Sequence, residues 1–248
     1  RDYEFNAYVK IGKFGNSYSD LLYQDVVEGN AFQLADKTIE VLERKYFKKN
    51  ISYEGINRVE ILEYPKKAIR ECLLNSIAHR CYPGPPVQIR VFDDKFMVWN
   101  PGELPSELTI EDLKKKHSSF PRNNLLADVF FQAGLIESFG RGTIDMIEEC
   151  SKADLPEPEF EIINGGFSVT FFKDKFTEKW LNQQGLNSRQ IKAILHLKTY
   201  NKISNSKYQE LCETSKGTAT RDLRELVEKY NILIKKGKGA GTFYEIKY

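Results

Sequence analysis

The sequence predicts an α+β protein in two parts: a layered body with a largely antiparallel sheet, then a smaller module of three helices and a hairpin. In the body, apolar residues alternate in some segments, as on half-buried strands, and recur at helical spacing in others. Charge sets the smaller module apart. Residues 181–248 carry 13 Lys and Arg against 6 Asp and Glu, whereas the whole chain has a formal charge of only +2. This asymmetry indicates a basic module that faces a polyanion.

Composition excludes several classes of protein. With 41% hydrophobic and 12% aromatic residues in 248, the chain can fill a core, which argues against disorder. The sequence contains no run of about 18 apolar residues, the length that a membrane span needs, and no signal peptide opens it. Cys72, Cys81, Cys150 and Cys212 form no CxxC pair, which suits a reducing cytosol. We expect a cytoplasmic protein with no membrane partner. Because the sequence opens on Arg1, we interpret it as a fragment of a longer chain.

The elements of the body follow from periodicity and turn residues. Pro65 suits the first turn of a helix. The inward stripe expected on this helix consists of Ile69, Cys72, Leu73, Ser76 and Ile77. The turn sequences Asp93-Asp94 and Asn164-Gly165-Gly166 each join two alternating segments, as in hairpins. A polar stretch, 48–58, precedes the helix that Pro65 opens. The expected elements are a strand from Phe5 to Ile11, a helix over 30–47, a helix from Pro65 to about Tyr82, strands at 87–91 and 96–99, a short helix at 110–115, helices over 124–133 and 143–153, and strands at 160–163 and 167–172.

A polar stripe marks the helix that follows Pro65. Glu71, Asn75 and His79 recur at every fourth position and so share one face. A solvated face explains such a stripe, but a carboxylate four residues before an amide also suits a magnesium-nucleotide site. Further along, Gly102 follows a strand, and the run from Gly140 to Thr143 precedes a helix whose N-terminus can accept phosphate.

Four longer segments, taken together, resemble one known family. It is the GHKL-type ATPase-like domain of transcriptional regulators, often labelled as RecG-related helicase C-terminal regions. The resemblance covers about residues 60–172, and members commonly carry a Schlafen-type DNA-binding domain upstream and a winged helix downstream. The segments are YPKKAIRECLLNSIAHRCY (Tyr64–Tyr82), WNPGELP (Trp99–Pro105), PRNNLLADVF (Pro121–Phe130) and GLIESFGRGTIDMIEEC (Gly134–Cys150).

The resemblance implies roles for individual residues. Glu71 occupies the position of the general base, and Asn75 that of the magnesium ligand. Gly140 and Gly142 fall in the glycine box close to the phosphates, with Thr143 at the start of the following helix. Residues 117–123 lie where a lid is expected. ATP and magnesium are the cofactors that this resemblance implies.

One departure from the family pattern bears on activity. The motif Asp-x-Gly-x-Gly, whose aspartate binds the adenine amino group, is here Asn100-Pro101-Gly102-Glu103-Leu104. Asn100 can still accept a hydrogen bond, but its neutral amide lacks the negative charge of the aspartate. The second glycine of the motif is also missing. Nucleotide binding therefore stays open, and appreciable ATP hydrolysis is not favoured. The sequence also lacks a Gly-x-x-x-x-Gly-Lys-Ser/Thr loop, which argues against a helicase motor.

The C-terminal module is expected to contain helices at 188–200, 206–212 and 215–230 and strands at 232–234 and 243–246. Asn187-Ser188 should cap the first helix and Asn205 the second, and Thr214 or Ser215 should start the third. In helix-turn-helix proteins, the N-terminal part of the recognition helix enters the major groove. The run from Thr218 to Leu223, with the Gly-Lys-Gly loop after it, closely resembles winged-helix repressors. A basic module for protein interaction remains the alternative. The candidate DNA contacts are Thr218, Thr220, Arg221 and Arg224 on the third helix and Lys235, Lys236 and Lys238 in the loop.

We therefore predict a GHKL ATPase-like layered α/β sandwich followed by a winged helix-turn-helix domain. Residues 1–60 form a connecting region, 61–175 the ATPase-like domain and 181–248 the DNA-binding domain. The expected function is DNA-binding transcriptional regulation with double-stranded DNA as the partner. An active ATPase or nucleotide-gated switch acting on DNA is the alternative, and a scaffold without ligands is a third hypothesis. A homodimer is expected from the paired half-sites of such regulators; apolar residues in 126–136 could form its interface, although core packing explains them slightly better.

Overall fold

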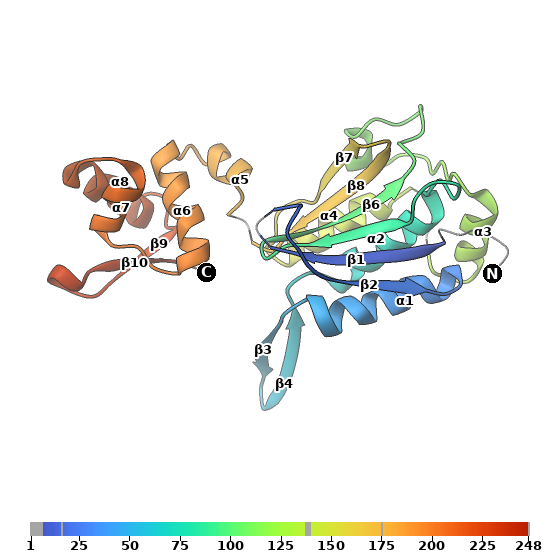
Figure 1. Cartoon of the computed structure of the whole chain (residues 1–248), viewed down its shortest axis with the longest axis horizontal. Helices are drawn as coiled ribbons and strands as arrows, with labels where there is room; N and C mark the ends of the chain where they lie inside the picture. Colours follow the sequence, from blue (N-terminus) through green and yellow to red (C-terminus); the bar gives the residue numbers. More distant parts are fainter. Residues whose placement is uncertain (1–6, 16, 137–139, 175, 248) are drawn as a thin grey trace. The chain divides into compact units, whose positions relative to one another are not determined.

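The structure is a computed structural model that describes residues 7–15, 17–136, 140–174 and 176–247. The chain divides into two compact units, Arg1–Asp174 and Lys175–Tyr248, which we call the body and the C-terminal unit. Figure 1 colours the body from blue to yellow and the C-terminal unit from orange to red. The expected strand start at Phe5, the segment 137–139 within the last family-like motif and the expected domain end at Lys175 lie outside the described residues.

One layer of the body is a six-stranded sheet in the order β2-β1-β5-β6-β8-β7. β1 runs parallel to β5, and the other neighbouring strands are antiparallel, so the sheet is mixed but largely antiparallel. The strands are β1 (Tyr8–Phe14), β2 (Leu21–Glu28), β5 (Val87–Val91), β6 (Lys95–Pro101), β7 (Glu159–Ile163) and β8 (Gly166–Phe172).

The two N-terminal strands differ from the expectation that residues 1–60 only connect to the body. In the parallel pair, Val9 lies opposite Val87 and Ile11 opposite Ile89, and all four side chains are buried. Alternate residues of a strand point to the same face, so β1 extends the apolar face of the sheet. β1 and β2 are therefore part of the body itself.

Helices form the second layer of the body. They share one hydrophobic core with the strand residues on the apolar face, which include Ile11, Val98 and Phe171. The body is thus a two-layer arrangement in which the core lies between sheet and helices. The main elements of this layer are α1 (Ala31–Val41), η1 (Leu42–Tyr46), which is a π-helical turn, α2 (Lys66–His79) and α4 (Gly142–Lys152).

Helix α2 begins one residue later and ends three residues earlier than the sequence predicts. Pro65 is its N-cap, with ψ near 119°, rather than a residue of the first turn. The helix ends at His79, three residues before Tyr82, because the residue before a proline disfavours helical geometry and Pro83 follows Tyr82. The expected inward stripe is buried throughout: Ile69, Cys72, Leu73, Ser76 and Ile77.

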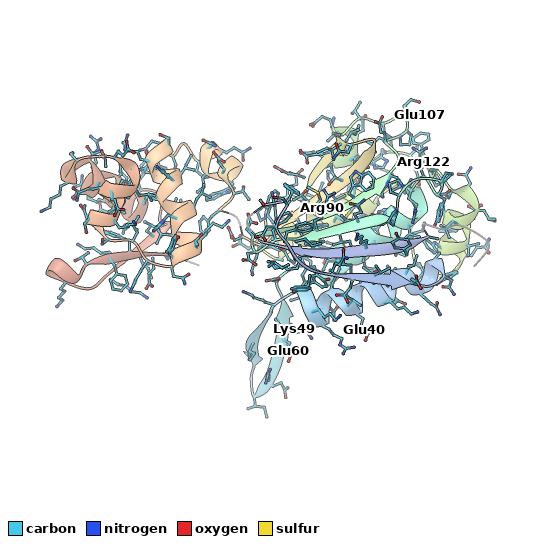
Figure 2. All side chains as sticks on the ribbon, in the orientation of Figure 1. Glu40, Lys49, Glu60, Arg90, Glu107 and Arg122 are labelled. Carbon is cyan, nitrogen blue, oxygen red and sulfur yellow. The ribbon has the colours of Figure 1, made fainter. Side chains whose placement is uncertain are left out.

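A separate two-stranded hairpin occupies the stretch interpreted as a polar connection. Its strands are β3 (Lys49–Glu54) and β4 (Asn57–Leu62), which pair antiparallel. Lys49 and Glu60 form an ion pair across the strands at 3.2 Å, and Figure 2 labels both. Gly55 adopts a φ of +63° in the turn, a conformation that glycine reaches without steric cost. The polar character of the segment fits a hairpin in which residues 49, 51, 55–58 and 60 are exposed.

Two short elements lie between β6 and α4, namely η2 (Asp112–Lys114), a 3-10 turn, and α3 (Asn124–Gln132). The apolar segment 126–136 divides between interior and surface. Phe130 is fully buried in the body core, whereas Val129 and Phe131 are 37% and 50% exposed. Part of this segment therefore packs in the core, as the sequence favoured, and part faces solvent.

The C-terminal unit has the expected order of three helices and a hairpin around a core of its own. An additional short helix precedes them, because Thr177 caps the segment around Trp180. Among the described residues, we find no helix with the length and apolar character needed to cross a membrane. The elements are α5 (Glu178–Gln183), α6 (Ser188–Tyr200), α7 (Asn205–Cys212), α8 (Lys216–Glu228), β9 (Leu233–Lys236), η3 (Gly239–Gly241) and β10 (Phe243–Ile246).

Side-chain caps start the helices of this unit. Asn187 caps α6 and Ser215 caps α8, as expected. The cap of α7 is Ser204 rather than Asn205. Asn205 is the first residue of α7, and its amide donates to Thr220 of α8 at 3.0 Å. The prediction was wrong by one residue because both side chains can cap a helix and only their tertiary contacts distinguish them.

Candidate functional site

A cavity of about 590 Å³ opens in the body beside α2, the end of β6, the segment 102–124 and the start of α4. Figure 2 labels two of its lining residues, Glu107 and Arg122, at the same end of the body. The cavity brings together all the nucleotide-site candidates that the sequence suggested: Glu71, Asn75, Asn100, Gly102, Gly140, Gly142 and Thr143.

Glu71 and Asn75 lie one turn apart on α2, and both are half-buried. The Asn75 amide donates to Glu71 Oε1 at 3.0 Å. Gly142, the first residue of α4, lies directly against this pair. A Cβ at position 142 would overlap the Glu71 carboxylate and come within 3.0 Å of Asn75 Nδ2. Glycine therefore permits the first turn of α4 to approach the polar stripe of α2.

Gly140 has a second close neighbour. It adopts a φ of +63°, and a Cβ there would overlap the carbonyl oxygen of His117. Thr143 Oγ1 donates to the carbonyl of Leu113 at 2.7 Å, and the His117 ring lies 3.3 Å from the same hydroxyl. These contacts hold the loop after η2, the segment in which a lid was predicted, against the start of α4.

Asn100 and Gly102 lie where β6 ends. The Asn100 side chain is 4% exposed and lines the cavity, and its amide donates weakly to Pro101 O at 3.4 Å. Gly102 has a φ of +103°, and a Cβ there would come within 2.9 Å of Arg122 Nε. This end of the cavity therefore combines a buried amide with a backbone that Arg122 approaches closely.

Arg122 and Asn123 tie the lid segment to the end of α2, contacts that the sequence pattern does not reveal. Arg122 donates to His79 O at 3.2 Å and to Glu103 O at 2.9 Å. Asn123 donates to Ala78 O at 2.8 Å and to the backbone carbonyl two residues later at 2.9 Å. The acceptors are backbone carbonyls, so no residue type at their positions signals the contact.

Burial lowers the pKa of His79, and the nearby Arg122 and His117 act in the same direction. His79 therefore contributes a neutral ring to the cavity wall at neutral pH. Among the described residues, no group of three or more His, Cys, Asp and Glu side chains could hold a metal. Magnesium commonly takes one or two protein ligands and completes its shell with water and phosphate oxygens. The amide oxygen of Asn75 beside Glu71 fits that kind of site.

The candidate DNA contacts occupy helix α8 and the β9–β10 hairpin. Arg221 and Arg224 are exposed, and Arg224 is paired loosely with Glu228 at 3.9 Å. Thr220 is exposed and donates to Lys216 O at 2.8 Å, whereas Thr218 is half-buried and contacts the Ser215 cap. The lysines of the hairpin are all exposed: Lys235, Lys236 and Lys238.

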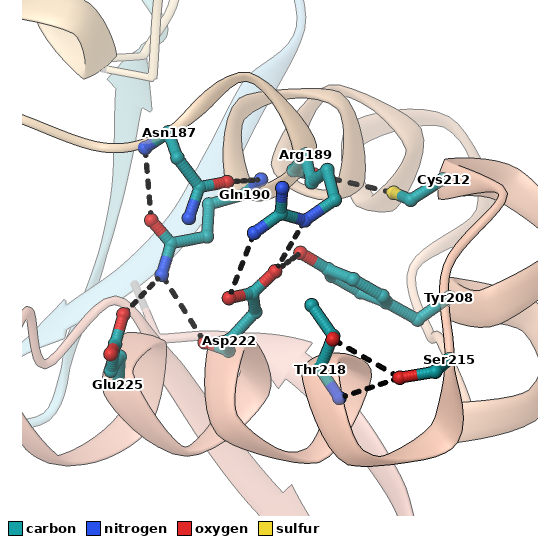
Figure 3. A network of polar contacts seen from close by, with 9 residues as sticks. All are labelled: Asn187, Arg189, Gln190, Tyr208, Cys212, Ser215, Thr218, Asp222 and Glu225. Atoms are coloured by element: carbon teal, nitrogen blue, oxygen red, sulfur yellow. Dashed lines mark hydrogen bonds and ion pairs between the residues drawn. The ribbon is translucent and has the colours of Figure 1, made fainter.

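A buried network fixes the opposite side of α8 (Figure 3). Asp222 is 1% exposed and accepts hydrogen bonds from Arg189 at 2.8 Å and from the Tyr208 hydroxyl at 3.0 Å. Gln190 adds bonds to Asp222 O and to the Glu225 carboxylate. This network joins α6, α7 and α8 on the inner side of α8, and the exposed Arg221 and Arg224 lie on its outer side.

The comparison with protein families concerns the body. Residues 84–171 match the family model described as "Putative ATP-dependent DNA helicase recG C-terminal". Over these residues the body is similar to the family that this model describes. The match begins after α2, so Glu71 and Asn75 lie outside it, whereas Asn100, Gly140 and Thr143 lie inside.

Among solved structures, the chain is similar to the DIP2311 protein from Corynebacterium diphtheriae, with 19% sequence identity and a TM-score of 0.59. The similarity covers 98% of this chain and 51% of that one, so the chain spans about half the length of its structural relative. At this identity the likeness concerns the fold alone. No curated protein matches the chain.

Proposed function

We propose that the chain is a DNA-binding transcriptional regulator whose C-terminal unit is a winged helix and whose body is an ATPase-like domain. The observation that carries this proposal is the exposed basic surface of α8 and the β9–β10 hairpin, opposite the buried Asp222 network. A fixed inner side and a basic outer side are what a recognition helix needs to enter a groove lined by phosphates.

The order of elements supports a winged helix. Helices α6, α7 and α8 are followed by two antiparallel strands, and Ile203, between α6 and α7, pairs with Tyr244 of β10. The Asn205–Thr220 hydrogen bond holds α7 against the N-terminal half of α8. Such a rigid pair of helices can present Arg221 and Arg224 to base edges or phosphates, while Lys238 contacts the backbone from the hairpin.

Binding of the full chain to duplex DNA tests this proposal. Fluorescence anisotropy with a mixed pool of labelled duplexes at low salt should show saturable binding that weakens as salt rises. Selection from that pool should then enrich a preferred sequence. No binding of any duplex at low salt would exclude the proposed DNA-binding role.

A homodimer forms part of this proposal, because helix-turn-helix proteins commonly bind paired half-sites with two-fold symmetry. Light scattering of the full chain with a duplex that carries two copies of the preferred site should give the mass of a dimer on DNA. The mass of one chain per duplex at saturation would contradict the dimer and leave the DNA-binding proposal in place.

The alternative is a nucleotide-gated switch or active ATPase, and the contact between Gly142 and the Glu71–Asn75 pair favours it. In this site, Asn75 would hold magnesium, which neutralises phosphate charge when bound. Glu71 would orient or deprotonate water, and the first turn of α4, with Gly140 before it, would accept the phosphates. Asn100 and Gly102 would contact the base at the far end of the cavity.

Isothermal calorimetry of the full chain with Mg-ATP and with a nonhydrolysable analogue tests this second function. Binding of both, with release of phosphate from ATP alone, would support an active ATPase. Binding without hydrolysis would support a nucleotide-gated switch. Absence of binding would leave the body without a nucleotide role.

A further inference from the structure

The hairpin of β3 and β4 is a two-stranded sheet separate from the main sheet of the body, and Figure 1 shows it extending away from α1. Two of its apolar side chains face solvent. Ile51 on β3 is 56% exposed, and Ile56 in the turn is 98% exposed. A single two-stranded hairpin is only marginally stable in water, and three or more strands are needed for independent stability. A further strand would therefore stabilise this hairpin.

Each strand of the hairpin has an outer edge on which no other strand of the described chain pairs. The backbone groups of such an edge are a template for pairing with another chain. A two-fold axis perpendicular to the sheet places a strand antiparallel to its own copy, and both copies keep the same face. Because residues of one face alternate along a strand, the two positions that lie opposite each other must be an even number of residues apart.

One register of β4 that obeys this rule matches opposite charges. With Val59 on the two-fold axis, Arg58 of each copy lies opposite Glu60 of the other. Opposite charges at directly opposed positions stabilise antiparallel strands, whereas like charges there destabilise them. Registers centred one residue to either side place Arg58 opposite Arg58, or Glu60 opposite Glu60. Charge therefore favours the register centred on Val59.

The outer edge of β3 offers no such match. The charged residues of β3 are Lys49 and Glu54, which are an odd number of positions apart and fall on opposite faces of the strand. No register that obeys the two-fold rule places these two positions opposite each other. Charge complementarity thus distinguishes β4 from β3 as the strand that pairs with its own copy.

The charged groups of β4 also make ion pairs within one chain. Glu60 pairs with Arg58 at 3.2 Å and with Lys49 on β3 at 3.2 Å. Exposed ion pairs contribute little to stability, so an exchange of partners between two copies costs little. In the register centred on Val59, Glu60 keeps Lys49 as its neighbour and gains an arginine from the other copy.

We propose that β4 is the contact strand of a homodimer, in which two hairpins form one four-stranded sheet centred on Val59. The inference names the surface of the homodimer proposed above, so it rests on that part of the proposed function. One pair of six-residue strands is small beside a standard interface of about 1,600 Å². Association should therefore depend on concentration, and DNA with two half-sites should strengthen it by holding two chains together.

Two charge reversals test the register with the full chain in the absence of DNA. Arg58→Glu and Glu60→Arg each create like charges at both contacts of a homodimer. Each variant alone should dimerise at least about tenfold more weakly than wild type in sedimentation equilibrium. An equimolar mixture of the two variants restores opposite charges at both contacts and should dimerise about as well as wild type. An effect confined to one chain cannot produce this recovery on mixing.

Lys207→Glu is the matched control, because it reverses an exposed, ion-paired lysine of the C-terminal unit. It should dimerise as wild type. A reversal variant that dimerises as well as wild type, or a mixture that dimerises no better than its components, would overturn the role of β4. A wild-type chain that stays monomeric up to several hundred micromolar would also overturn it and leave the hairpin to another partner.

Disulfide trapping provides a second measurement if the reversal variants fail to fold. Val59→Cys should give a covalent dimer on mild oxidation, because opposed positions of antiparallel strands bring their Cα atoms within reach of a disulfide. Ile56→Cys, in the exposed turn, is the matched control and should remain monomeric, and the wild-type chain with its free cysteines gives the background. Equal trapping at both positions would contradict the register centred on Val59.

The mass of the complex with a two-site duplex separates this inference from the proposed function. Two chains of Arg58→Glu bound per duplex as tightly as two wild-type chains would remove β4 from the interface and leave the homodimer on DNA in place. One wild-type chain per duplex at saturation would overturn the homodimer, and the role of β4 with it.

Discussion

Gly142 lies so close to Glu71 that any side chain at position 142 would overlap the Glu71 carboxylate. Two segments about seventy residues apart in sequence therefore meet at a glycine. The contact packs the start of α4 against the polar stripe of α2 in the wall of the cavity. The effect of this contact on the stability of the body and the binding of a nucleotide in the cavity can be tested separately.

Substitution of Gly142 by alanine should destabilise the body. The added methyl group would meet Glu71 Oε1, the end of a flexible side chain, so the cost should lie near the lower end of the about 1–3 kcal/mol typical of overpacking. Urea denaturation followed by tryptophan fluorescence measures the effect, with Trp99 reporting the body and Trp180 the C-terminal unit. Gly217→Ala is the matched control, because Gly217 lies in α8 with only Ser215 Oγ nearby, at 4.0 Å. That variant should be stabilised by about 0.5–1 kcal/mol, since alanine favours a helix over glycine. Equal stability of Gly142→Ala and wild type would contradict the close packing of α2 on α4.

Mg-ATP should raise the melting temperature of the full chain. A ligand that binds only the folded state adds RT ln(1 + [L]/Kd), which is about 2.7 kcal/mol at a hundredfold excess over Kd. Asn75→Ala should remove the magnesium-dependent part of the shift, because it deletes the amide ligand. Glu71→Gln should keep most of the shift and abolish any hydrolysis, since the amide cannot serve as a base. An unmoved melting curve for wild type at millimolar Mg-ATP would show that the cavity does not bind this nucleotide.

Two substitutions should weaken DNA binding in different ways. Arg221→Ala should cost about 1–3 kcal/mol on a preferred site if the guanidinium reads a base. Lys238→Ala should weaken binding to all sequences and flatten the log–log salt dependence by about 0.9, the effect of one phosphate contact. Lys67→Ala removes the same charge from an exposed position on the body and serves as the control. Anisotropy titrations at several salt concentrations distinguish these outcomes, and equal losses in all three variants would point to net charge instead of a defined surface.

The stability of the body should fall at acidic pH partly through Asp25 on β2. A hydrogen bond from Lys45 lowers the pKa of Asp25, and a second one from the Tyr46 hydroxyl adds to the effect, while burial opposes them. Because the folded pKa lies below the unfolded value of about 3.9, this contribution is present above that pH and is lost as pH falls through the folded value. Asp25→Asn should lower stability at neutral pH by about 1 kcal/mol or less, as for other partly exposed pairs, and should flatten the acid limb of a urea–pH series. An unchanged acid limb would assign that pH dependence to other carboxylates.

Local pattern was enough to predict much of the site. The spacing of Glu71 and Asn75 on one helix face, and the position of Gly140 and Gly142 before a helix, follow from the sequence because each depends on neighbours a few residues away. The inward stripe of α2 is also a local feature, and its residues are buried. These elements meet in one cavity, as the order of motifs suggested.

Contacts between distant segments were harder to predict. The pairing of β1 with β5 joins Val9 to Val87, and nothing in the sequence near Val9 indicates a partner so far away. The hydrogen bonds of Arg122 run to backbone carbonyls, which every residue possesses. Ser204 caps α7, whereas Asn205 donates a hydrogen bond to Thr220, fifteen residues further along the chain. In each case the deciding atom lies outside the local pattern.

The parallel pairing of β1 with β5 also constrains how the body assembles during synthesis. The hairpin of β1 and β2 is synthesised before β5, so the strand that covers its inner edge is completed only at Val91. Translation proceeds at about 5–20 residues per second, so β1 waits several seconds for its partner. During that time the edge of β1 and the apolar side chains of Val9 and Ile11 are open to other chains, which makes this the interval in which a holdase chaperone would protect the nascent protein best.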